Sequence, residues 1–392
     1  MTTISQKTPD IEMLTRSLRR FIEAELHPLE QKIEMMQEPP DDIIRPLREK
    51  AKALGFFAMN MPAEVGGGGL STLEMCFAEE QIGRTSPVLI RQVFGQVYLM
   101  LLACRGEQRE RYLLPTVRGE RNCCIAITEP NSGSDAASIT STAEPRGNGF
   151  VINGLKHFIS DGDRADYAIV MAVTDKAKRV KGGVTAFLVD KDTPGFRVGA
   201  SQQMMGQQGV RHVELQFSDC YVGPEQVLGE VGQGFPMMLA SVSRVRLAQI
   251  GARAVGMAGR LLDLSAVYAS QRSQFGKKIG EFQMVQQMLA DMATEMFAAR
   301  TMVMVTAANV DAGIDCREQV SMVKLFASEM VNRAADRAVQ IFGGMGVCKE
   351  APVERFFRDA RVFRIYDGTS EIHRGRIANV LMRDGQGPLG LE

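Results

Sequence analysis

Two segments of the chain combine carboxyl, hydroxyl and glycine residues in an order that could do chemistry. The first, residues 125–135, has the sequence IAITEPNSGSD. Its small and hydroxylated residues would let backbone N–H groups approach an aromatic ring system and a phosphate. The second, residues 365–374, has the sequence IYDGTSEIHR and places Asp367 directly before a Gly-Thr pair. Each segment also has a simpler interpretation. The first could be a polar turn, and the second could be a turn that caps a helix, with the negative charge of Glu371 interacting favourably with the helix dipole in the first turn.

Three regions of different periodicity must position these segments. Apolar residues recur at helical spacing from residue 11 to about 120, and again from residue 235 onward. Between them lie short β-rich stretches such as YAIVMAV and VTAFLVD, separated by Gly, Asn, Asp and Pro. A chain of 392 residues is expected to form two or three packed units. We therefore predict an α+β fold with an N-terminal all-α domain (1–121), a middle β-sheet or barrel domain (122–232) and a C-terminal helical bundle (233–392).

Composition and spacing disfavour several classes of function. The 46 basic and 46 acidic residues balance, so neither nucleic acid nor an anionic membrane is an expected partner. The seven cysteines form no CxxC pair and the four histidines lie in different segments, which predicts no metal site, no disulfide framework and a reducing, cytoplasmic location. No run approaches the roughly 20 apolar residues of a membrane span. Residues 66–69 are four glycines, but no Lys-Ser/Thr pair follows them; they indicate a loop before a capped helix, not a phosphate loop.

Several motifs follow one another in an order that resembles a known family. They are MPAEVGG (61–67), IAITEPNSGSD (125–135), VINGLKHFIS (151–160), RSQFG (272–276), QIFGG (340–344), RDAR (358–361) and IYDGTSEIHR (365–374). Their order and spacing resemble the acyl-CoA dehydrogenases over nearly the whole chain. The resemblance implies an FAD-dependent enzyme of fatty acid metabolism that converts an acyl-CoA to a 2-enoyl-CoA and passes electrons to an electron-transfer flavoprotein.

The same resemblance implies a cofactor site shared between subunits. On the middle domain, the residues along the isoalloxazine would be Ile125, Ile127, Thr128, Gly133, Ser134, Phe158 and Ser160, with Ser160 reaching flavin N5. A neighbouring subunit would supply Arg272, Phe275, Gln283, Gln340, Gly343 and Gly344, while Thr369 and Glu371 would lie near the adenine half. The fork of an arginine suits pyrophosphate oxygens. A shared cofactor implies a homo-oligomer, either a dimer or the tetramer usual in the family.

By resemblance, Asp367 is the base that removes the substrate α-proton while hydride passes to flavin N5. Well-known members have Glu here, and a side chain one methylene shorter withdraws the carboxylate by more than about 1 Å, a misplacement that can cost roughly a hundredfold in rate. Some subfamilies carry the catalytic Glu on a bundle helix, immediately before an Arg; the matching pair, Ser243-Arg244, has no carboxylate. Arg244 matches an arginine behind the base loop, where it could tune Asp367. The predicted substrate contacts are Ser134, Ser241, Arg244, Tyr366 and Gly368.

Other branches of the superfamily give alternative functions. A nitroalkane-oxidase-like enzyme also uses Asp at the base position and needs no CoA. A redox-neutral branch lacks the carboxylate altogether, so the presence of Asp367 disfavours it. A nucleic-acid-associated member would carry additional basic sequence, which the neutral charge of this chain does not support.

Overall fold

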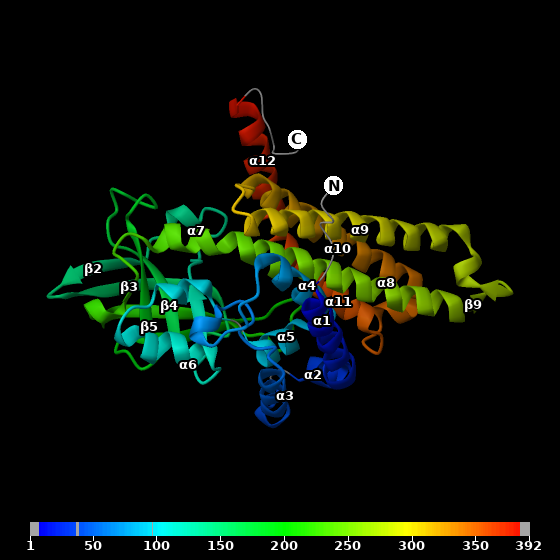
Figure 1. The fold of residues 1–392 in the computed structure, drawn as a ribbon, viewed down its shortest axis with the longest axis horizontal. Helices are drawn as coiled ribbons and strands as arrows, with labels where there is room; N and C mark the ends of the chain where they lie inside the picture. The colour runs from blue at the N-terminus through cyan, green and yellow to red at the C-terminus, as the bar shows by residue number, and fades with distance from the viewer. Residues whose placement is uncertain (1–7, 37–38, 96, 385–392) are drawn as a thin grey trace.

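The computed structural model describes residues 8–36, 39–95 and 97–384, which fold as helices, then a sheet, then long helices (Figure 1). This order confirms the predicted α+β class with helical, sheet and helical regions in succession. Among the described residues, no helix combines the length and the apolar character needed to cross a membrane.

The N-terminal helices pack on one another and on the bundle. They are α1 (Pro9–Phe21), α2 (Glu30–Glu34), α3 (Asp41–Ala53), α4 (Thr72–Ile82), α5 (Pro87–Phe94) and α6 (Leu114–Val117). The expected capped helix after the glycine run is α4: the Ser71 side chain accepts from the Glu74 N–H, and the Glu74 carboxylate accepts from the Ser71 N–H. A buried ion cluster ties this region to the C-terminal helices, because Glu30 accepts bonds from Arg260 and Arg355 at 2.6–2.9 Å.

The middle region is one mixed sheet of eight strands. They are β1 (Cys123–Ala126), β2 (Thr142–Arg146), β3 (Gly149–Ser160), β4 (Tyr167–Val173), β5 (Val184–Asp190), β6 (Phe196–Gln202), β7 (His212–Val222) and β8 (Val227–Leu228), in the order β6-β7-β3-β2-β4-β5-β8 with β1 parallel to β4. Strands β4 and β5 are buried along almost their whole length, which requires cover on both faces.

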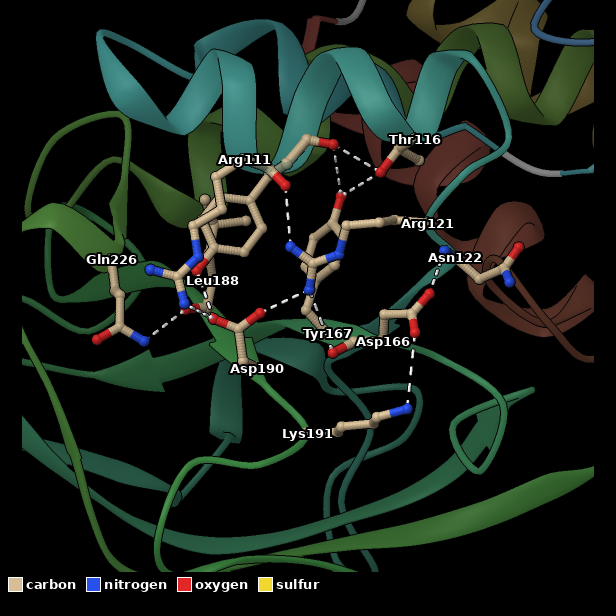
Figure 2. A network of polar contacts seen from close by, with 11 residues as sticks. Arg111, Thr116, Arg121, Asn122, Asp166, Tyr167, Leu188, Asp190, Lys191 and Gln226 are labelled. Atoms are coloured by element: carbon tan, nitrogen blue, oxygen red, sulfur yellow. Dashed lines mark hydrogen bonds and ion pairs between the residues drawn. The ribbon is translucent and has the colours of Figure 1, made fainter.

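A polar network fixes the entry into β1 (Figure 2). The Asp190 carboxylate at the end of β5 accepts from Arg111 at 2.7 Å and from Arg121 at 2.6 Å, and the Arg121 guanidinium lies over the Tyr167 ring. The Asn122 N–H donates to Asp166 at 2.8 Å, one residue before β1 begins. The helical segment that contains α6 is thereby clamped to the sheet immediately before the strand that leads into residues 125–135.

The C-terminal bundle is built from α7 (Gly234–Val245), α8 (Arg253–Gln271), α9 (Gln283–Asp311), α10 (Arg317–Phe342), α11 (Pro352–Arg361) and α12 (Ser370–Asp384). A π-helical segment, Arg246–Ala252, joins α7 to α8, and a short hairpin of β9 (Ser273–Gln274) and β10 (Lys277–Lys278) follows α8. The helices α8, α9 and α10 run alongside one another, and the hairpin lies at the end of the bundle opposite the sheet (Figure 1).

Candidate active site

Asp367 lies on a tight loop between the 3-10 turn Val362–Arg364 and α12. Both Asp367 (φ 54°) and Gly368 (φ 97°) have positive φ, which Asp tolerates and Gly permits without strain. Thr369, rather than Asp367, caps α12, since its Oγ1 accepts from the Ile372 N–H at 3.2 Å. Within the residues that the structure describes, no donor hydrogen-bonds the Asp367 carboxylate. The carboxylate is therefore available for chemistry.

Three basic side chains hold the backbone of this loop. The Arg246 Nε donates to the carbonyl of Asp367 at 3.0 Å, and the Nε2 of His373 lies 3.2 Å from the same oxygen. The Nζ of Lys324, a fully buried residue on α10, donates to the carbonyl of Gly368. Two of the three come from distant helices, so the position of the base loop depends on the packing of the bundle.

The electrostatic environment makes Asp367 a stronger base than a free aspartate. The residue is exposed on its open side, but the protein packed behind it desolvates the carboxylate and raises its pKa, against the opposing charges of Arg246 and Lys324. Desolvation also lowers the pKa of Lys324 to about 8, although Asp367 acts to raise it. Burial, followed by the charges of Arg246 and Lys324, lowers the pKa of His373 to about 4. His373 is therefore neutral at pH 7 and donates to the loop as an imidazole.

The arginine behind the loop is Arg246, and the prediction of this contact for Arg244 is wrong. Arg244 is an exposed residue of α7, whereas Arg246 opens the π-helical segment and its charge acts on Asp367. The match to the family position points to Arg244, whereas the fold brings the arginine two residues later, at the start of the π-helical segment, to the loop. The residue immediately before the contacting arginine is Val245, so this helix position still carries no carboxylate. The substrate contact predicted for Arg244 stays a prediction.

The other predicted substrate contacts lie on two segments. Tyr366 and Gly368 flank Asp367 in the loop, and Tyr366 packs against Phe363. Ser241 lies on α7, where its hydroxyl donates to the carbonyl of Met238 at 2.9 Å. Ser134 is exposed beyond β1. The contacts of these residues with substrate stay predictions.

A buried ion pair fixes the predicted flavin-facing segment. Ile125 lies on β1, and Ile127 and Thr128 continue it as half-buried residues. Glu129 then turns inward and accepts from Lys156 Nζ at 2.8 Å, as well as from the N–H and hydroxyl of Thr140 at 2.7 Å. Lys156 also donates to the Ile127 carbonyl at 3.1 Å. Beyond this pair, Gly133 and Ser134 are exposed and open to an approaching ligand.

Phe158 and Ser160 stand at an irregularity in β3. The register between β3 and β7 shifts between Lys156 and Ile159, and Phe158 has φ 57° with 49% of its surface exposed. Such bulges change the direction of side chains and are frequent beside active sites. Ser160, at the end of the strand, contacts His212 on β7 through its hydroxyl.

The remaining predicted cofactor residues gather at the far end of the bundle. They are Arg272, Phe275, Gln283, Gln340, Gly343 and Gly344, all exposed, with Phe275 94% exposed. Stacking of Tyr268 on Phe342, with centroids 4.2 Å apart, brings the ends of α8 and α10 together. The π-helical segment and α8 lie between Arg246 and this end, and the 19 residues of α8 alone span about 28 Å at 1.5 Å per residue. One chain therefore presents two separate sets of predicted cofactor residues (Figure 1). Thr369 and Glu371 lie with the base loop instead.

Comparison with known proteins places the chain in a family. It matches the N-terminal domain of acyl-CoA dehydrogenases over residues 8–120, the middle domain over 124–220 and the C-terminal domain over 232–382. Acryloyl-CoA reductase (NADH) of Anaerotignum propionicum is 37% identical over 96% of this chain and 95% of that protein. The caffeyl-CoA reductase-Etf complex subunit CarC of Acetobacterium woodii is 35% identical over 95% of this chain and 98% of its own length. The structure of butyryl-CoA dehydrogenase from Megasphaera elsdenii superposes with a TM-score of 0.87 at 31% identity, covering 97% of this chain and all of that one. The chain therefore belongs to the acyl-CoA dehydrogenase family.

Proposed function

We propose that this acyl-CoA oxidoreductase is an FAD-dependent dehydrogenase in which Asp367 removes the α-proton of an acyl-CoA thioester. The observation that carries the proposal is a carboxylate with a raised pKa that accepts no hydrogen bond from the described residues, on a loop fixed by Arg246, Lys324 and His373. A base tuned toward neutral pH and held in place is what general-base catalysis requires. The family membership supports the substrate class.

FAD is the cofactor, and the exposed residues fit it. A side chain added at Gly133, Gly343 or Gly344 would meet no atom within 4 Å, so the backbone at these places is open to close approach. Arg272 is exposed and offers a planar fork for phosphate oxygens. When bound, FAD supplies the hydride acceptor.

The chain's own groups provide the proton transfer. The α-proton passes to the Asp367 carboxylate, and the three basic side chains keep the loop from moving as the proton arrives. The neutral imidazole of His373 hydrogen-bonds the loop without adding a positive charge that would lower the pKa of Asp367. The hydrogen bonds to the backbone of Asp367 set the position of the loop, and this position can compensate for a side chain shorter than that of Glu.

The positions of the predicted cofactor residues support an oligomer, and the name of one relative supports a protein redox partner. The predicted cofactor residues of the sheet region and those at the hairpin end of the bundle lie at opposite ends of one chain (Figure 1), which is explained if each FAD lies between two subunits of a dimer or tetramer. The relative from Acetobacterium woodii carries an Etf complex in its name, which supports an electron-transfer flavoprotein as the partner of this chain. We place the enzyme in the cytoplasm.

Anaerobic titration of the purified holoprotein tests the function. Bleaching of the flavin absorbance by an acyl-CoA is expected for the wild type and for Asp192→Asn, a control at an exposed turn of the sheet region. Asp367→Asn preserves size and is expected to abolish bleaching while FAD remains bound. Bleaching of Asp367→Asn at near wild-type rate would remove Asp367 from the mechanism. Bleaching by a nitroalkane alone would assign the oxidase branch instead.

A further inference from the structure

Ser160 and His212 form a side-chain pair across two neighbouring strands. They are directly opposite each other in the antiparallel register of β3 and β7, so both side chains lie on the same face of the sheet. The Ser160 Oγ and the His212 Nδ1 are 3.0 Å apart. The backbone at this point is fixed, since the N–H of Asp161 donates to the carbonyl of Arg211 at 2.7 Å. The pair is thus a defined feature of the strand ends and not a chance surface contact.

The surroundings of His212 determine which nitrogen carries the proton. The residue is 8% exposed, and its Nε2 is buried with no hydrogen-bond partner among the described residues. Burial and then the charge of Arg91 lower its pKa to about 4, against the opposing charge of Asp161, so the ring is neutral at pH 7. With the proton on Nε2, a buried N–H would have no acceptor, and orphaned buried N–H groups are rarer in native proteins than unpaired acceptor atoms. The proton therefore belongs on Nδ1, where it can be donated.

This assignment fixes the role of the serine hydroxyl. If Nδ1–H is the donor, the Ser160 oxygen is the acceptor, and the hydroxyl proton of Ser160 must point elsewhere. We propose that His212 is a positioning residue whose Nδ1–H holds the Ser160 oxygen so that the serine hydroxyl is free to donate to flavin N5. The inference rests on the FAD site of the proposed function and adds to it a residue on β7 that contacts neither cofactor nor substrate. Because N5 would carry a hydrogen after reduction, a hydrogen bond between Ser160 and N5 would differ between the oxidised and the reduced flavin, so a change in it would shift the reduction potential.

Single and double variants of the holoprotein test this role through the cofactor itself. His212→Leu and Ser160→Ala are each expected to alter the flavin absorbance spectrum and to shift the two-electron potential in the same direction, by about 30 mV for a tenfold change in the reduction equilibrium. His212→Asn, whose amide N–H can occupy the place of Nδ1, is expected to restore most of the wild-type value. In the Ser160→Ala background, His212→Leu should add nothing, since its effect passes through Ser160.

Two results would overturn the inference. An unchanged spectrum and potential in His212→Leu would do so, and so would a His212→Leu effect that keeps its full size without Ser160. If His212→Leu does not fold, ¹⁵N NMR of the wild-type histidines gives the answer directly. With four histidines in the chain, the resonance lost in His212→Asn identifies the ring, and its shifts must show a protonated Nδ1. A wild type that binds FAD and is bleached by acyl-CoA keeps the proposed function intact whichever result is found.

Discussion

Replacing Gly368 by alanine perturbs the loop that carries Asp367 without removing any functional group. An ideal Cβ at this position lies 2.8 Å from the Nε2 of His373 and 3.5 Å from an Arg246 guanidinium nitrogen. Reaching an ordinary contact of 3.4 Å requires a movement of about half an ångström. The movement strains the bond from His373 to the Asp367 carbonyl, and a φ of 97° itself costs an alanine about 1–3 kcal/mol.

The expected result is a slower chemical step with an intact cofactor site. Because a misplacement near 1 Å can cost roughly a hundredfold, we expect Gly368→Ala to reduce flavin about ten- to a hundredfold more slowly in anaerobic stopped-flow mixing with an acyl-CoA. Gly375→Ala is the matched control, since it lies on α12 with no atom within 4 Å of an added Cβ. A Gly368→Ala enzyme with full FAD content and a rate within about twofold of the wild type would refute the argument that loop geometry limits proton abstraction.

Four further predictions concern the groups around the loop and beneath the flavin-facing segment. Lys324→Met removes a charge that lowers the pKa of Asp367, so the acid limb of the rate of flavin reduction should move to higher pH; an unmoved limb would exclude this coupling. The pKa of Lys324 is lowered to about 8, so its charged form destabilises the fold below that pH, and this destabilisation disappears as pH rises. Between about pH 8 and 10, the free energy of unfolding measured by denaturant titration should therefore rise less in Lys324→Met than in the wild type. Arg246→Gln should slow flavin reduction about tenfold or more and Arg244→Gln less than about twofold at saturating substrate, and equal effects would contradict the contact seen here. Burial acts to raise the pKa of Glu129, but the ion pair with Lys156 and the other donors hold this pKa at about 2, so the carboxylate stabilises the fold above about pH 4.5 and loses this effect as pH falls towards 2. Glu129→Gln should lower the free energy of unfolding by about 3–5 kcal/mol. A loss below about 1 kcal/mol would show that the ion pair is not needed for stability.

The sequence predicted the features that depend on consecutive residues or on local periodicity. Helical and strand periodicity identified the three regions, and the segment around Asp367 was found because its residues are consecutive. The groups that act on it were missed for different physical reasons. Lys324 is 43 residues away on a long helix, where a lysine usually indicates a solvated face, and only the packing of the bundle buries it. Arg246 was missed because the family resemblance points to Arg244, two residues earlier, and only the fold shows which of the two arginines contacts the loop.

His212 illustrates a second limit. Its partner Ser160 is 52 residues away, and the two meet because β3 and β7 pair in a particular register. Strand neighbours and register depend on the order of strands in the sheet, which periodicity does not reveal. A histidine at the start of a strand carries no signal of its own in one sequence.

The two sets of predicted cofactor residues lie at opposite ends of one chain (Figure 1), and this separation links cofactor occupancy to protein concentration. If each FAD touches two chains, the ligand binds the assembled form more tightly than the free subunit, and by mass action it stabilises the assembly. Reciprocally, dilution that dissociates subunits must also release FAD, with both transitions following the same concentration curve. Under this scheme an isolated subunit with an intact fold and every predicted residue in place would hold half of two sites and a complete copy of none.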